Sequence, residues 1–101
     1  MFKYMQYNVN VALQILPWSA TKDTYDIVDQ AIKVIHDSGI KYRVCPFETV
    51  MEGDYGVIMK IVEKVMDTCL EYGSDNILSN LKIQVSRNRD VTIEDKMVKY
   101  D

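Results

Sequence analysis

The chain lacks most of what a metal site, a disulfide framework or a membrane span requires. Its 101 residues include one histidine and two cysteines, Cys45 and Cys69, with no C-x-x-C spacing. One histidine is too few for a typical zinc site, and we expect both thiols to be free and reduced. No apolar run approaches the roughly 20 residues that span a bilayer. The N-terminus also lacks the apolar core and cleavage site of a signal peptide. These absences predict a cytoplasmic protein with no metal and no membrane contact.

Basic charge and glycine are also scarce. Lys and Arg total 12 against 15 Asp and Glu, which gives a net charge of −3, whereas nucleic-acid-binding surfaces are normally basic. The four glycines form no phosphate-binding loop. No serine or cysteine can be matched to His36 as a nucleophile with its base. We therefore expect neither nucleic-acid binding nor enzymatic activity.

Apolar residues at alternate positions predict four strands. The clearest covers 8–16, and Pro17 is expected to end it because proline cannot donate to a strand ladder. The other strands are expected at about 41–45, 47–52 and 77–86. The apolar face of the last strand is expected to consist of Ile77, Leu81, Ile83 and Val85.

Apolar residues at helical spacing predict two helices between these strands. Thr21 or Ser19 can cap the first, with Asp23 in its first turn, and Asp54 can cap the second. Both helices are expected to end at a glycine, namely Gly39 and Gly73. The buried stripes are expected to be Val28, Ala31, Ile32 and Ile35 in the first helix, and Ile58, Ile61, Val62, Val65 and Cys69 in the second. Thr92 can cap a short terminal helix that runs to about Tyr100.

This order of elements predicts an α+β fold of the ferredoxin-like βαββαβ type, with one domain over residues 1–101. Its four-stranded antiparallel sheet carries both helices on one face, followed by a short C-terminal helix. The open face is expected to carry Asn10, Ala12, Gln14, Glu48, Val50, Glu52, Asn80, Lys82 and Gln84. It offers no aromatic ring to stack on RNA. A bare sheet face on so small a domain favours burial by another subunit, and the alternative is a solvated face.

The densest polar group lies in the run Glu48-Thr49-Val50-Met51-Glu52-Gly53-Asp54. Glu52 ends a strand just before a helix, where folds of this kind often hold small ligands. Its carboxylate can pair with an amino group and a ring nitrogen, and the alternative is a solvated strand-end acid. Strict alternation places Thr49 on the opposite face. Both residues therefore contact one ligand only if the strand bulges or the ligand wraps its end; ordinary strand propensity also explains Thr49.

Three further residues complete the candidate ligand-binding set. Trp18 follows the first strand and can stack on a heteroaromatic ring, although a core or interface plug is the commoner use of such a residue. Ser19 could bind a phosphate at the start of the first helix, or simply cap that helix. Gln14 lies on the expected open face.

The run Thr49 to Asp54 resembles the T-x-x-E-G-[DE] signature of the small thiamine-binding protein family, the YkoF-like group. Other segments match that family in the same order. They are Asp37–Tyr42 for S-G-[IL]-K-Y at the end of the first helix, Glu71–Gly73 at the end of the second, Leu81–Arg87 for the last strand and its basic turn, and Glu94 with Lys96 for a terminal E-x-K. The resemblance spans residues 8 to 99.

The resemblance implies a ferredoxin-like fold, dimers or tetramers assembled through the sheets, and no known catalysis. It also implies that the ligand is thiamine or its hydroxymethylpyrimidine part, with Thr49 and Glu52 as ligand contacts. Trp18 would be a stacking partner, although the family has no fixed aromatic at that place. Two alternatives stay open: a homo-oligomeric interaction module with no small ligand, and an uncharacterised enzyme.

Overall fold

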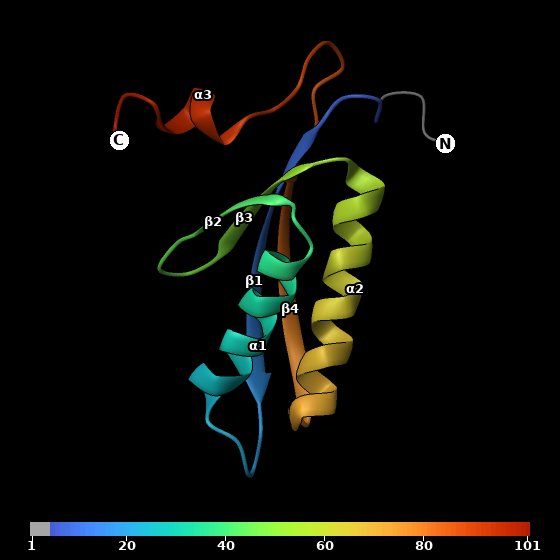
Figure 1. The fold of residues 1–101 in the computed structure, drawn as a ribbon, viewed down its shortest axis with the longest axis vertical. Helices are drawn as coiled ribbons and strands as arrows, with labels where there is room; N and C mark the ends of the chain where they lie inside the picture. The colour runs from blue at the N-terminus through green and yellow to red at the C-terminus, as the bar shows by residue number, and fades with distance from the viewer. Residues whose placement is uncertain (1–4) are drawn as a thin grey trace.

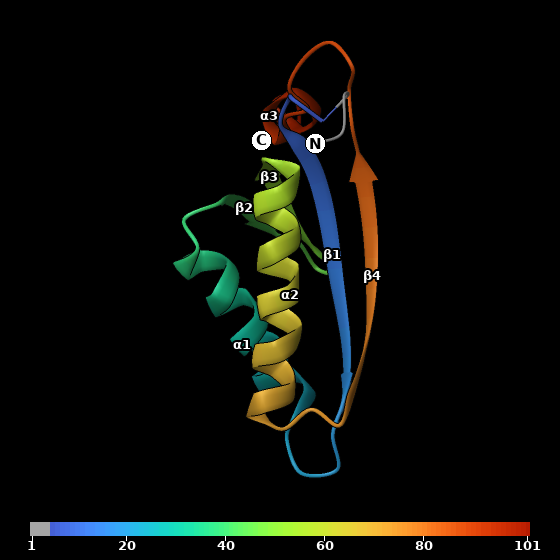
Figure 2. The ribbon, with the colours of Figure 1, turned by 90° about the vertical axis from the view of Figure 1, so that its right-hand side faces the viewer.

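A computed structural model describes residues 5–101 of the chain. Its elements are β1 (Val9–Trp18), α1 (Thr24–Asp37), β2 (Lys41–Val44), β3 (Thr49–Gly53), α2 (Tyr55–Tyr72), β4 (Asn76–Gln84) and α3 (Ile93–Met97). The strands form one antiparallel sheet in the order β2-β3-β1-β4. Figures 1 and 2 show α1 and α2 on the same side of this sheet, with α3 near the N-terminal end of β1. The predicted α+β ferredoxin-like fold is therefore confirmed.

The core lies between the sheet and the two long helices because alternate residues of β1 and β3 point toward them. Val11 and Met51 are register partners at the centre of this face, and both side chains are fully buried. The helix α2 buries the whole predicted stripe. In α1 the buried residues are Ile27, Ala31 and Ile35. The buried stripe therefore includes Ile27, which was not predicted, whereas the predicted Val28 and Ile32 are only half-buried.

Both long helices begin at an aspartate. The Asp54 carboxylate accepts a hydrogen bond of 3.0 Å from the Val57 amide, as predicted for α2. For α1 the prediction was wrong by a few residues, since Asp23 is the cap and accepts from the Tyr25 amide at 3.1 Å. Gly39 and Gly73 follow the helices as predicted, with φ of 78° and 134°.

Pro17 does not end β1, contrary to the prediction. The strand continues to Trp18 because β4 pairs with β1 along its whole length, as far as Asn76. The other neighbour, β3, pairs with β1 only as far as Leu13. One side of β1 therefore has no strand partner at Pro17, and a residue without an amide hydrogen is tolerated there.

The apolar face of β4 is covered less than predicted. Leu81 and Ile83 are register partners of Leu13 and Val11, so they point to the helix side of the sheet. They nevertheless stay 37% and 43% exposed because β4 is an edge strand. Only Ile77, near the start of β4, packs against the core. The strand thus keeps an uncovered apolar margin.

Gly53 packs closely against the loop before β2 and does not occupy a left-handed turn. Its φ is not positive, since positive values among residues 5–101 occur only at Gly39 and Gly73. A Cβ atom built on Gly53 would lie 2.5 Å from Cδ1 of Ile40, which comes from the loop before β2. The glycine lets β3 and this loop approach each other at the start of α2.

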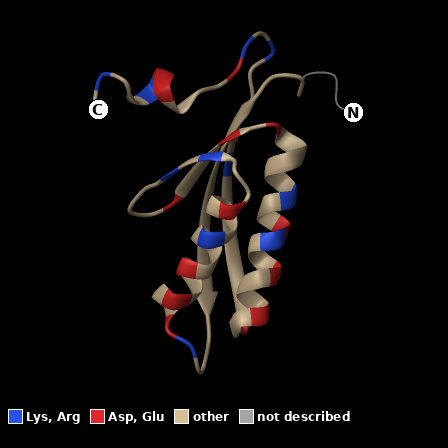
Figure 3. Cartoon of the chain, viewed as in Figure 1, with Lys and Arg blue, Asp and Glu red and all other residues tan. Residues whose placement is uncertain are grey.

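Acidic and basic residues occur along both long helices and are interleaved along α2 (Figure 3). No helix within the described residues has the length and hydropathy to cross a membrane.

Candidate functional site

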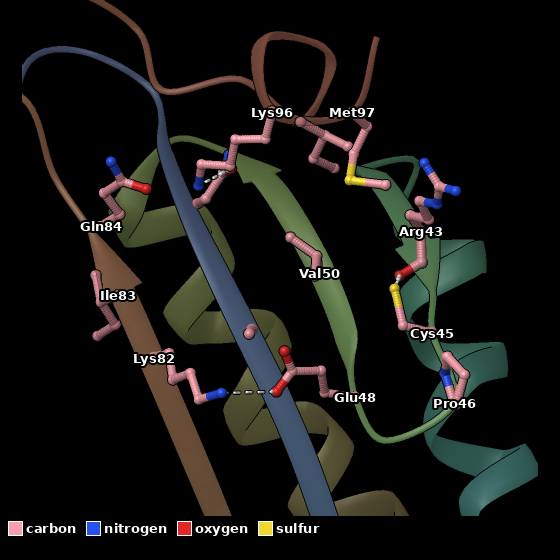
Figure 4. Close-up of a pocket in the computed structure, with 13 residues that line it drawn as sticks. Arg43, Cys45, Pro46, Glu48, Val50, Lys82, Ile83, Gln84, Lys96 and Met97 are labelled. Carbon is pink, nitrogen blue, oxygen red and sulfur yellow. Dashed lines mark hydrogen bonds and ion pairs between the residues drawn. The ribbon is translucent and has the colours of Figure 1, made fainter. Parts of the chain in front are cut away.

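The open face of the sheet forms one side of a pocket of about 570 Å³. At one end of the sheet the C-terminal segment crosses the strands and carries α3, which contributes Ile93, Lys96 and Met97 to the lining (Figure 4). The pocket is lined by Asn10, Ala12, Arg43, Cys45, Pro46, Glu48, Val50, Lys82, Ile83, Gln84, Ile93, Lys96 and Met97. These residues come from all four strands or the loops beside them, and from α3.

The pocket has an apolar body and polar margins. Ala12 and Val50 are register partners on β1 and β3 and form its floor. Ile93 and Met97 of α3 border it at the end of the sheet. A small apolar cavity with a few polar groups at its edge is the usual form of a small-molecule site.

A buried amide holds the C-terminal segment in place. The Asn10 side chain is only 4% exposed. Its Nδ2 donates to the Val91 carbonyl at 2.9 Å, and its Oδ1 accepts from Nζ of Lys96 at 2.9 Å. The Asn8 backbone adds two more bonds, since its amide donates to Asp90 Oδ1 at 2.8 Å and its carbonyl accepts from the Val91 amide at 3.0 Å. Asn8, just before β1, and Asn10, near its start, thereby fix the position of the C-terminal segment.

Glu52 supports the same segment from β3. Its Oε1 accepts a hydrogen bond of 2.7 Å from the Ile93 amide, the first residue of α3. Its Oε2 lies 3.7 Å from Nζ of Lys41, and its side chain is 12% exposed. Both carboxylate oxygens are therefore engaged within the protein, at the end of the sheet where α3 docks.

Two further ion pairs flank the pocket. Nζ of Lys82 lies 3.5 Å from Oε1 of Glu48, across the open face. Arg43 donates to both carboxylate oxygens of Asp101, at 2.8 and 3.0 Å. This bidentate hydrogen bond and the attraction between the charges lower the pKa of the Asp101 carboxyl and raise the pKa of Arg43.

The predicted ligand-binding residues are not brought together. Glu52 borders the pocket and pairs with the lining residue Asn10 in the strand register. Gln14 lies on the open face outside the pocket lining, and its Oε1 accepts a hydrogen bond from Asn80 at 3.1 Å. Thr49 is buried on the helix side of the sheet, opposite to Glu52 as alternation required. The role of each in ligand binding stays a prediction.

Trp18 and Ser19 lie at the far end of the sheet. Six positions along β1 separate Ala12 from Trp18, a distance of about 20 Å by strand rise. The indole is 59% exposed. Oγ of Ser19 is used locally, since it accepts from the Lys22 amide at 2.9 Å and donates to the Gly73 carbonyl at 2.8 Å.

Sequence reasoning missed that the C-terminal segment docks on the open face. None of the lining residues belongs to the predicted ligand-binding set, and those expected neither there nor on the open face are Arg43, Cys45, Pro46, Ile83, Ile93, Lys96 and Met97. One signal was present: Val91 and Ile93 are apolar residues that follow the polar run 86–90, and Val91 is buried. Such a residue marks the point at which a terminal segment docks.

The two thiols differ in environment, and both are free. Cys69 is fully buried in the core, and burial raises the pKa of its thiol. Cys45 is half-buried and lines the pocket. Within residues 5–101 no group of three or more potential metal ligands occurs.

The fold and the pocket define a small ferredoxin-like domain with a ligand-sized cavity on the open face of its sheet. A family model described as Thiamine-binding protein matches residues 11–101, and the chain belongs to this family.

Relatives of known sequence or structure agree with this assignment. A UPF0045 protein of Clostridium perfringens is 38% identical over 91 residues, which cover 90% of this chain and 95% of the relative. The solved structure of a domain of unknown function, DUF77, from Bacillus cereus has a TM-score of 0.91 at 32% identity and covers 99% of this chain and 96% of its own. A putative thiamine biosynthesis/salvage protein from Thermotoga maritima has a TM-score of 0.84 at 28% identity, with 93% and 99% coverage.

Proposed function

We propose that this protein binds thiamine or its hydroxymethylpyrimidine moiety in the open-face pocket, without catalysis, in the cytoplasm. The observation that carries the proposal is the pocket itself. Its volume of about 570 Å³ falls within the range of roughly 300–1,000 Å³ typical of small-molecule sites. The family assignment and the thiamine-related name of the Thermotoga relative support this class of ligand.

The pocket offers suitable partners for an aminopyrimidine ring. Such a ring has two flat apolar faces, which Val50 and Met97 can cover from β3 and α3. Its amino group and ring nitrogens lie at the edge, where the Glu48 carboxylate and the Gln84 amide line the pocket. A carboxylate and an amide together can accept and donate the hydrogen bonds that orient such a ring.

A binding role without chemistry also fits the groups around the pocket. The described residues include one histidine, His36, and its Nδ1 hydrogen-bonds to the hydroxyl of Tyr42 at 2.8 Å, away from the lining. Cys45 therefore has no imidazole beside it, and its thiol donates to the Arg43 carbonyl at 3.9 Å. Nucleophilic catalysis needs such a base within hydrogen-bond reach.

Filling the pocket should abolish ligand binding and leave the fold intact. Ala12→Phe places a ring on the pocket floor, and we expect the heat of thiamine binding to disappear in calorimetric titration. Leu16→Phe is the matched control, because Leu16 shares the strand and the face but lies four positions away and outside the lining. If the wild type gives no heat and no thermal shift at millimolar thiamine, the proposed function is wrong.

Alkylation of Cys45 provides a second readout of pocket occupancy. Bound ligand should slow the reaction of this lining thiol with iodoacetamide, whereas buried Cys69 should stay unreactive with or without ligand. Peptide mapping by mass spectrometry separates the two sites.

We also propose that the protein self-associates through its sheet. The supporting observation is the exposed apolar margin of the edge strand β4, where Leu81 and Ile83 lack a covering helix. Edge strands with free backbone groups pair readily with another strand. Pairing of β4 with its counterpart would continue the sheet and cover these side chains.

Replacing one margin residue should weaken this association. For Leu81→Lys we expect sedimentation to shift from a dimer or tetramer toward the 11.7 kDa monomer. Leu70→Lys is the control, since Leu70 is similarly exposed but lies on α2. A monomeric wild type at micromolar concentration would contradict the proposal.

A further inference from the structure

The charge around the pocket is opposite to that of the whole protein. The chain carries a net charge of −3. The charged residues in the pocket lining are nevertheless Arg43, Lys82 and Lys96 against a single acid, Glu48. A local excess of positive charge inside an acidic protein indicates a site for an anionic group.

Two of the three cations are neutralised by neighbours. Lys82 pairs with Glu48 at 3.5 Å. Arg43 is held by the carboxylate of Asp101 at 2.8 Å. These pairs contribute little net charge to the space between the sheet and α3, so the excess comes from the third cation.

Lys96 is different because its partner is neutral. Its ammonium donates to Oδ1 of Asn10 at 2.9 Å. Among residues 5–101, no carboxylate oxygen lies within 4.0 Å of that ammonium. Glu52 is the register partner of Asn10, and its oxygens are engaged with the Ile93 amide and Lys41. The other acids of α3, Glu94 and Asp95, are exposed.

The position of this ammonium is set by a buried group. Asn10 is almost fully buried, and its second polar atom is fixed by the Val91 carbonyl at 2.9 Å. Its oxygen therefore points in one direction and holds Lys96 at the rim of the pocket (Figure 4). Lysine can give two further hydrogen bonds from the same nitrogen.

We propose that the natural ligand of the pocket is the phosphorylated form of the heterocycle, with its phosphate monoester bound by Lys96. This inference rests on the proposed function and selects among its ligands. A phosphate monoester carries about −1.5 to −2 charges near pH 7 and accepts strong hydrogen bonds from ammonium groups. Thiamine itself is a cation and gains nothing from an unpaired ammonium.

The test compares thiamine with thiamine monophosphate by calorimetry at low ionic strength. For the wild type we expect the monophosphate to bind at least about 10-fold more tightly, with the preference decreasing as salt is added. Lys96→Gln should bring the ratio of the two affinities close to one. Lys96→Arg keeps the charge and should keep the preference, which separates a lost charge from a disturbed fold. Lys99→Gln is the matched control, because Lys99 lies in the same segment outside the lining.

The outcomes separate the two proposals. Equal affinities for both compounds in the wild type, or a preference unchanged in Lys96→Gln, would overturn the inference and leave the proposed function standing. Absence of binding by either compound would overturn the proposed function and the inference with it. A preference that Lys96→Gln removes and Lys96→Arg retains supports both.

Discussion

Replacing Met51 by alanine is expected to lower the free energy of unfolding by about 3 kcal/mol. Met51 lies at the centre of β3, is fully buried on the helix side of the sheet, and faces the core residue Val11 across the strand pair. Truncation removes three side-chain heavy atoms where neighbouring side chains can only partly close the cavity. Thermal unfolding followed by circular dichroism should show a midpoint about 15 °C lower.

Val50→Ala is the matched control because it truncates the adjacent residue on the other face of the same strand. Val50 is half-buried on the pocket floor. We expect it to cost at most about 1 kcal/mol of stability, and to weaken ligand binding instead. Equal losses of stability from the two substitutions would contradict the assignment of one face to the core and the other to the pocket.

Replacing Glu52 by alanine is the second change with a large expected effect. It removes the acceptor of the Ile93 amide and the partner of Lys41. A hydrogen bond to a charged group contributes about 1.5–3 kcal/mol, so we expect a loss of about 2 kcal/mol in the docking of α3. Ligand affinity should decrease with it, since α3 forms one side of the pocket.

Hydrogen exchange measured by NMR tests this prediction locally. The Ile93 amide should exchange about 30-fold faster in Glu52→Ala than in the wild type, as a loss of about 2 kcal/mol requires. Glu52→Gln keeps an oxygen acceptor and should restore part of the protection. Glu48→Ala is the control, because it removes another open-face acid whose carboxylate pairs with the side chain of Lys82 and not with α3. Unchanged exchange at Ile93 would rule out Glu52 as the anchor of α3.

The fold was predictable because local patterns and the global topology agree. Alternation in β1, the helical spacing of α2, and the caps and stops at Asp54, Gly39 and Gly73 each describe an element by itself. Once these elements are placed, the sheet order follows from the ferredoxin-like arrangement. The errors were local. Pro17 lies inside β1 because β3, the neighbour on one side of β1, pairs with it only as far as Leu13. Asp23 caps α1 in place of Thr21 or Ser19.

The pocket was much less predictable. Pattern reasoning correctly placed Asn10, Ala12 and Val50 on the open face. It did not predict the residues of the C-terminal segment that also line the pocket. Their position depends on contacts of that segment, such as Lys96 with Asn10, that no periodicity encodes. Trp18 was predicted to stack on the ligand that Glu52 binds, yet Trp18 and Glu52 occupy opposite ends of the sheet.

The contacts that complete the pocket also join the two ends of the described chain. The hydrogen bonds of Asn8 with Asp90 and of Asn10 with Lys96 span 82 and 86 positions of sequence. Closing so long a loop costs more entropy than forming any hairpin in the sheet, and such contacts form late in folding. On a ribosome, β1 emerges long before the segment that covers it. The nascent protein therefore leaves this face of the sheet without its C-terminal contacts until residues 90–97 have been synthesised.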